Sequence, residues 1–90
     1  MTSAKSSAHR PSITVHLSYP VSHDGKAISE LTLRRPTVAD QLASVEGGGG
    51  VAGIELRMVS ILSGVPVEAL HGMDFGDYMK IQAALRDLVA

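Results

Sequence analysis

Histidines are the residues of this chain best suited to bind a metal ion, but their spacing does not form a site. They stand at positions 9, 16, 23 and 71, and the chain contains no cysteine. A zinc site usually takes pairs of His or Cys ligands a few residues apart on one element, and no such pair is present. The sequence therefore predicts no metal and no cofactor. We expect all four histidines on the surface, with His16 on the polar face of a strand.

Serines and carboxylates do not form a catalytic arrangement either. No serine lies in the Gly-x-Ser-x-Gly pattern of a nucleophile elbow, and Ser63-Gly64 is typical of a helix end. Asp74 and Asp77 suit a helix N-terminus, where a carboxylate accepts hydrogen bonds from free N–H groups. We therefore expect a protein that is not an enzyme.

The run of four glycines at 47–50 is the remaining motif that suggests chemistry, because glycine backbones can approach phosphate closely. A phosphate-binding loop requires Gly-Lys-Ser/Thr after a strand, whereas here Val51-Ala52-Gly53 follows the run. We interpret Gly47–Gly50 as a flexible linker between two helices.

Length and charge restrict the function classes further. The 90 residues carry a net charge of −1, which fits one small domain and excludes a two-domain enzyme. Residues 1–35 hold five basic residues against two acidic ones, a net charge of +3, and residues 36–90 hold three against seven, a net charge of −4. No apolar run is long enough for a membrane span, and the N-terminus lacks the apolar core of a signal peptide. We expect a cytoplasmic protein with no membrane partner.

The basic residues of the N-terminal part leave nucleic-acid binding open as an alternative. A small regulator of this kind would use Lys26, Arg34 and Arg35 together with Lys5 and Arg10. Nucleic-acid binders usually carry a dense basic stripe with aromatic residues between the charges, and five scattered residues fall short of that. Nucleic acid is therefore not the expected partner.

A β-hairpin is the first element that the pattern predicts. Residues 1–12 are polar and small, which indicates a disordered tail. Apolar and polar residues then alternate from Ile13 through Tyr19, and a second strand spans about 27–34. Asp24-Gly25 supplies the turn. A lone hairpin is marginally stable, so helices must cover its apolar face.

Helices are predicted for the rest of the chain. They span about 37–46 behind a capping box of Thr37 and Asp40, about 51–63 before a left-handed Gly64, one turn within 66–71, and 74–90. Apolar stripes follow helical spacing; they comprise Val38, Leu42 and Val45 in the first helix and Tyr78, Ile81, Leu85 and Leu88 in the last. The fold class is α+β, a single domain over 13–90 with an N-terminal β-hairpin packed against about three α-helices.

Two of the predicted helices carry more apolar residues than one buried stripe requires. In the helix over 51–63, Leu56 and Val59 point away from the stripe that contains Ile54 and Met58. Met79 also lies off the stripe of the last helix. These three residues are candidates for contact with a partner or a second copy, although the last helix covering both faces is an equal alternative.

The order of the motifs resembles the small tail assembly chaperones of Mu-like and related contractile-tailed bacteriophages. The resemblance covers roughly residues 12–90. The motifs that carry it are Ile13-Thr14-Val15-His16-Leu17, Asp24-Gly25-Lys26, Glu30-Leu31-Thr32-Leu33-Arg34, Pro36-Thr37-Val38, Asp40, Ile61-Leu62-Ser63-Gly64-Val65-Pro66, Leu70 and Asp77-Tyr78. The glycine run at 47–50 departs from the pattern.

The resemblance implies a non-catalytic function that spacing alone does not show. Such proteins bind the long helical tape measure protein, keep it soluble and help recruit tail tube subunits, and they self-associate. They act in the host cytoplasm and are not expected in the mature virion. Their genes, in phages or prophages, often yield a longer product by frameshifting. Leu56, Val59 and Met79 become the candidate contact residues, and a structural tail tube or terminator subunit is a further alternative.

Overall fold

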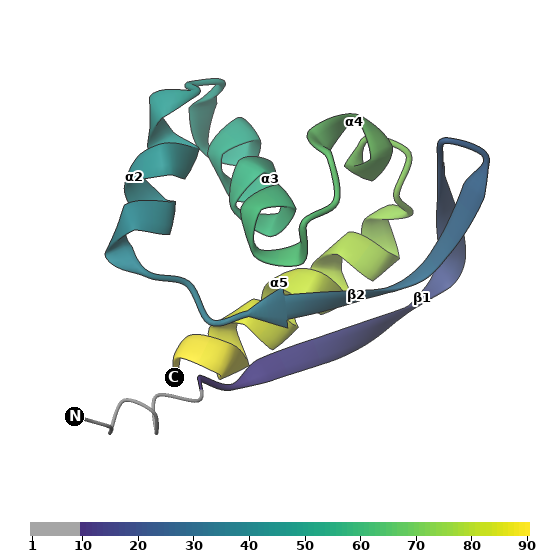
Figure 1. Ribbon diagram of the computed structural model, residues 1–90, viewed down its shortest axis with the longest axis horizontal. Coiled ribbons are helices and arrows are strands. Elements are labelled where there is room, and N and C mark those ends of the chain that lie inside the picture. The colour runs from purple at the N-terminus through teal and green to yellow at the C-terminus, as the bar shows by residue number, and fades with distance from the viewer. Residues whose placement is uncertain (1–9) are drawn as a thin grey trace.

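A β-hairpin followed by four helices makes up the part of the chain that the computed structural model describes, residues 10–90 (Figure 1). This arrangement confirms the predicted α+β fold and element order. The tail predicted for 1–12 falls largely outside the described residues, and the first strand begins at Ser12. The elements are β1 (Ser12–His23), β2 (Lys26–Arg34), α2 (Val38–Glu46), α3 (Gly50–Ser63), α4 (Val67–Leu70) and α5 (Phe75–Val89).

The hairpin pairs β1 and β2 antiparallel, from Ser12 opposite Arg34 to His23 opposite Lys26. Asp24 and Gly25 both have positive φ, 53° and 76°, as the tight turn between two twisted strands requires. The predicted Asp-Gly turn is therefore confirmed.

The ladder is interrupted between His16 and Val21. His16 faces Glu30 and Val21 faces Ile28, so four residues of β1 stand against the single Ser29 of β2. Strict alternation predicted Tyr19 on the buried face. This prediction is wrong, because the irregularity turns Tyr19 outward, with 65% of its surface exposed.

The carboxylate of Asp77 accepts hydrogen bonds from backbone N–H groups that have no partner in the interrupted ladder. Its two oxygens accept hydrogen bonds from the N–H groups of Ser18 at 2.9 Å and Tyr19 at 3.0 Å. Lys80 lies 3.0 Å from the same carboxylate and donates to the carbonyl of His16. Because Asp77 is almost fully buried in the first turn of α5, these bonds fasten α5 to β1. Asp74 caps the helix as predicted by accepting from the Asp77 N–H.

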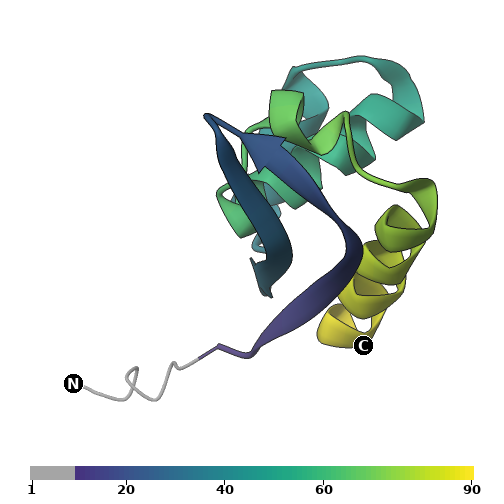
Figure 2. The ribbon, with the colours of Figure 1, turned by 90° about the vertical axis from the view of Figure 1, so that its right-hand side faces the viewer.

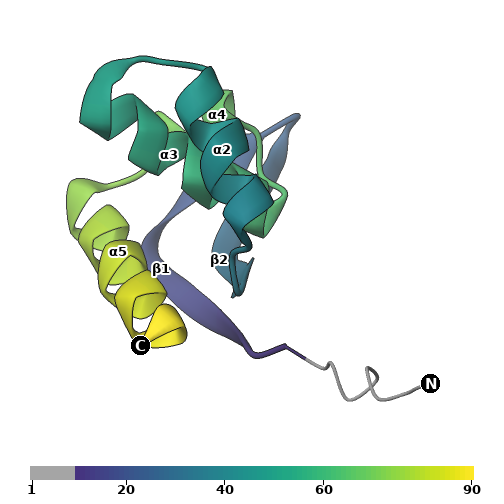
Figure 3. The same cartoon turned by 90° about the vertical axis from the view of Figure 1, so that its left-hand side faces the viewer.

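The helices lie on one side of the hairpin (Figures 2 and 3). The hydrophobic core lies between the hairpin and the helices. α3 packs mainly on β2, whereas α5 packs on β1. The buried residues come from both strands and from α3, α4 and α5; they are Val15, Leu17, Val21, Leu31, Leu33, Val59, Leu62, Leu70, Ile81, Ala84 and Leu88.

Polar side chains anchor α2. Arg34, at the end of β2, donates to both oxygens of Asp40 at 2.7 and 2.9 Å. Thr37 and Asp40 form the predicted capping box, in which each side chain bonds to the other's backbone N–H. The Arg34 guanidinium and the Thr37 N–H hold the pKa of Asp40 well below its usual range. As a result α2 turns its polar side toward the protein, with Asp40 and Ser44 buried.

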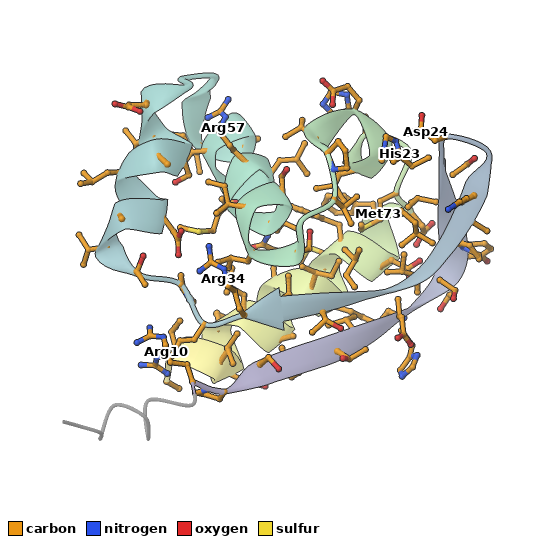
Figure 4. All side chains as sticks on the ribbon, viewed as in Figure 1. Arg10, His23, Asp24, Arg34, Arg57 and Met73 are labelled. Carbon is orange, nitrogen blue, oxygen red and sulfur yellow. The ribbon has the colours of Figure 1, made fainter. Side chains whose placement is uncertain are left out.

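The glycine run, expected to act as a flexible linker, adopts a tight turn between α2 and α3. Gly48, Gly49 and Gly50 all have positive φ. Arg57 reaches from α3 to this turn and donates to the carbonyls of Ser44 and Gly48 (Figure 4). A β-carbon at residue 47 would overlap the Arg57 guanidinium, so glycine there permits the contact.

We expect the protein to lose stability in acid, because two carboxylates titrate below their ordinary pKa in the folded state. Backbone donation from Ser18 and Tyr19 lowers the pKa of Asp77 to about 2, against about 3.9 in an unfolded chain. A depressed folded pKa contributes stability that is complete above roughly pH 5 and is lost as the pH falls toward 2. Urea unfolding followed by circular dichroism between pH 7 and pH 2.5 measures the loss.

The variant Asp77→Asn provides the control for this pH dependence. It should be less stable than the wild type at pH 7, because an amide can accept only one of the two N–H groups while placing a donor against the other. Its stability should fall less between pH 5 and 2.5. An equal fall in both proteins would contradict the assignment of the acid loss to Asp77.

Candidate functional site

The apolar stripe of α2 faces solvent, opposite to the orientation usual for an amphipathic helix on a core. Val38, Leu42 and Val45 are 78%, 64% and 45% exposed. The predicted stripe is correct in sequence, but it does not contact the core, because Arg34 and the capping box hold the polar side of α2 inward. An apolar helix face without a neighbour is typical of an interaction surface.

A second apolar surface lies between α3 and α5. It contains a hollow of about 240 Å³ whose walls come from α3, the α4 region and the start of α5. Phe75 stands at its rim with 72% of its surface exposed, and its ring lies 6.2 Å from that of Tyr78. The lining residues are Ala52, Leu56, Leu70, His71, Met73, Phe75 and Tyr78.

A second hollow of about 270 Å³ lies on the other side of α3, toward α2. Its α3 residues Ile54 and Met58 point away from Ala52 and Leu56 of the first hollow, and the two hollows share no lining residue. We call the first hollow the α3–α5 groove. The second hollow is lined by Gln41, Ile54, Glu55, Met58, Gln82 and Leu85.

Few polar groups line the α3–α5 groove. No lysine or arginine lines either hollow, and Glu55 is the acidic residue that does. Burial, assisted by the nearby Glu55 carboxylate, raises the pKa of the Tyr78 hydroxyl, which therefore stays neutral at physiological pH. The side-chain nitrogen of Gln82 is buried and has no hydrogen-bond partner among the described residues. The α3–α5 groove is thus mainly apolar, whereas the second hollow is half polar and contains Glu55 and the unpaired amide nitrogen of Gln82.

The three predicted contact residues lie in different environments. Leu56 is half-buried and lines the groove. Val59 is fully buried in the core, so it is not available to a partner, and for this residue the alternative in which the fold itself covers the second face of the helix is correct. Met79 is 50% exposed and lies one turn beyond Phe75 on α5, outside both hollows.

Sequence reasoning missed the groove residues of α5. It assigned Tyr78, Ile81, Leu85 and Leu88 to one apolar stripe; Ile81 and Leu88 are buried, whereas Tyr78 and Leu85 are partly buried at the edge of the core. Tyr78, Gln82 and Leu85 form a line at i, i+4 and i+7, which faces the two hollows. The signal in the sequence is the polar Gln82 at helical spacing between Tyr78 and Leu85, which separates this line from the buried Ile81 and Leu88.

The histidines form no metal site in the described part of the chain. His16 is exposed on the polar face of β1, as predicted, and its Nδ1 lies 3.3 Å from Glu30. No group of three potential metal ligands occurs within residues 10–90. Among the helices of this range, none combines the length and apolar character that crossing a bilayer demands.

Three of the basic residues on which nucleic-acid binding would depend donate hydrogen bonds within the protein. Arg34 pairs with Asp40, Arg35 donates to the carbonyl of Leu88, and Arg10 donates to the carbonyl of Pro36. Lys26 is exposed at the hairpin turn, and Lys5 lies outside the described residues. The three guanidinium groups therefore contribute to the fold.

Comparison with known proteins identifies one family. The family model described as "Phage tail assembly chaperone proteins, E, or 41 or 14" matches residues 14–90. Neither the curated proteins nor the solved structures yielded a match. The matched range includes both strands almost completely and all four helices of the described chain.

The orientation of α2 predicts that polar substitutions on its apolar stripe leave stability nearly unchanged. Val38→Thr and Leu42→Gln should each change the free energy of unfolding by less than about 0.5 kcal/mol, because both side chains are solvated in the folded state. Leu33→Ala, at a fully buried position, should cost roughly 2–5 kcal/mol. Urea unfolding measures all three. A loss above about 1.5 kcal/mol for Leu42→Gln would mean that α2 packs the other way.

Proposed function

Because the chain belongs to the family of phage tail assembly chaperone proteins, we propose that it binds the tape measure protein and keeps it soluble while the tail is built. Apolar surface left open on a small folded domain is the observation that carries this proposal. The α3–α5 groove and the α2 stripe are two such surfaces. A chaperone of this kind requires surfaces that cover apolar segments of another chain.

The two surfaces support a function with more than one partner. The α2 stripe is formed by α2 alone, whereas the groove is built by α3, α4 and α5. A chain that holds the tape measure protein at one surface keeps the other free for a tail tube subunit or a second copy. We therefore include recruitment of tail tube subunits and self-association in the proposed function.

The proposal assigns no catalytic step to the protein. The buried carboxylates, Asp40 and Asp77, are both saturated by hydrogen bonds within the fold. Groups held in this way stabilise structure and do not transfer protons at neutral pH, because the pKa of each lies well below 7. The expected site of action is the host cytoplasm, before the chaperone leaves the finished particle.

Co-expression tests the chaperone function directly. With this chain present, the soluble fraction of the tape measure protein should rise severalfold over expression of that protein alone, and the two should co-elute by size exclusion with light scattering. An unrelated soluble protein of similar size expressed at the same level serves as the control. A tape measure protein that stays insoluble, beside a chain that elutes alone, would contradict the proposal.

Analysis of purified virions separates the chaperone from a structural tail subunit. Mass spectrometry should detect this chain in lysates of infected or induced cells and not in purified particles. Recovery of the chain from virions in a fixed ratio to tail tube subunits would instead indicate a structural role.

A further inference from the structure

An exposed aromatic ring and an unfilled apolar hollow lie side by side on one face of the protein. The ring belongs to Phe75, the first residue of α5, which is 72% exposed. The hollow is the α3–α5 groove of about 240 Å³, and Phe75 stands at its rim. In Figure 1 the chain passes from α4 into α5 beside α3, and these elements supply the walls. A face that carries both a projecting side chain and a recess can pair with a copy of itself.

The packing of α5 explains why the Phe75 ring projects. The helix buries Asp77 and Ile81 toward the hairpin. Phe75 lies about 200° around the helix from Asp77, so it points away from the core. Because the Asp77 carboxylate accepts from the N–H groups of Ser18 and Tyr19, α5 cannot rotate to bury the ring without losing these bonds. The fold therefore keeps the ring at the surface.

The chemistry of the hollow suits an aromatic side chain. Its walls include the aliphatic side chains of Leu56 and Leu70, the thioether of Met73 and the ring of Tyr78. Aromatic rings pack favourably on other rings and on methionine sulfur. The Phe75 ring of the same chain lies 6.2 Å from the Tyr78 ring and remains largely solvated, so it leaves the hollow open. A ring from outside the chain can therefore enter it.

Polar groups beside the ring and the hollow are complementary as well. Asp74 directly precedes Phe75; it is exposed, and one of its oxygens caps α5 by accepting from the Asp77 N–H. His71 is exposed at the wall of the hollow, and its imidazole can donate a hydrogen bond. A ring that enters the hollow of a second copy carries its neighbouring Asp74 toward the His71 of that copy. Polar contacts around an apolar anchor are usual in interfaces.

We propose that two copies of this chain form a two-fold dimer in which Phe75 of each copy enters the α3–α5 groove of the other. The inference rests on the self-association included in the proposed function, and it names the surface that self-associates. Because the contact is the same on both copies, it closes on itself and gives a dimer and not a filament. Few residues take part, so the dimer dissociates in the micromolar range. The α2 stripe stays uncovered and available to another partner.

Size exclusion with light scattering over a range of concentrations tests the ring. The mass of the wild type should rise from that of one chain to that of two. Phe75→Ala should weaken this self-association at least tenfold, because buried aromatic anchors dominate small interfaces. Leu42→Ala removes another exposed apolar side chain, on the α2 stripe, and should leave self-association within twofold. Circular dichroism verifies that both variants are folded.

A second pair of variants tests the hollow. Ala52 lines the α3–α5 groove and is exposed, so Ala52→Phe fills the hollow without altering the core. Ala43 is an exposed alanine of α2 outside the groove, and Ala43→Phe is the matched control. Ala52→Phe should weaken self-association at least tenfold, while Ala43→Phe should leave it within twofold.

Mixing the two impaired variants tests whether the ring and the hollow contact each other. The Ala52→Phe copy retains Phe75, and the Phe75→Ala copy retains an open hollow. One of the two contacts can therefore form between them, although neither can form within a pair of identical copies. Native mass spectrometry with one variant isotope-labelled should show a heterodimer at a concentration where each variant alone is monomeric.

The outcomes distinguish the dimer from the wider function. A wild type that stays monomeric, equal effects of Phe75→Ala and Leu42→Ala, or a mixture without heterodimer would each overturn the inference. If a monomeric wild type still keeps the tape measure protein soluble, the dimer inference is wrong and the chaperone function stands. If the dimer forms through Phe75 while the tape measure protein stays insoluble, the chaperone function fails and the dimer contact stands.

Discussion

The buried carboxylate of Asp77 is the interaction on which the rest of the structure depends. Where the hairpin ladder is interrupted, the N–H groups of Ser18 and Tyr19 lose their strand partners, and Asp77 accepts both. An unpaired backbone donor inside a protein costs about as much as a lost hydrogen bond, so the irregular strand is stable only with α5 in place. The same carboxylate lies in the first turn of α5, where it also interacts favourably with the helix dipole. The Asp77 side chain thus satisfies the irregular part of β1 and holds the first turn of α5 against it.

The two exposed apolar surfaces result from the positions in which polar contacts hold α5 and α2. Asp77 bonds α5 to β1, α3 packs on β2, and the α3–α5 groove lies between the two helices. α2 is held by the Arg34–Asp40 pair and the capping box, which direct its apolar stripe to solvent. Hydrogen bonds set the orientation of α2, whereas in α5 they act together with the burial of Ile81, Ala84 and Leu88. Sites where local patterning and the fold disagree are often functional, and that agrees with a chaperone that must cover apolar segments of other chains.

Much of the architecture was predictable because it depends on short-range rules. The Asp24-Gly25 turn, the capping box at Thr37 and the left-handed Gly64 each follow from the conformations that a few adjacent residues allow. The α+β class and the family resemblance also came from the linear order of these elements; the structure confirms the class, and the family match over 14–90 confirms the resemblance. Of the predicted contact residues, Leu56 alone lines the groove. The groove itself was not predicted, because it joins residues of α3, the α4 region and α5 that are distant in the sequence.

The sequence by itself determined where strands and helices begin and end, and which helix faces are apolar. Only the tertiary structure decided which of those faces is buried. Hydropathy periodicity reports that Val38, Leu42 and Val45 share a side, but whether that side meets the core depends on Arg34 reaching Asp40. Burial of Val59 likewise depends on the position of α5. The hydrogen bond between Ser18 and Asp77, which are 59 residues apart, holds α5 in that position. The physical reason is that periodicity is local, whereas orientation results from competition among distant polar and apolar contacts.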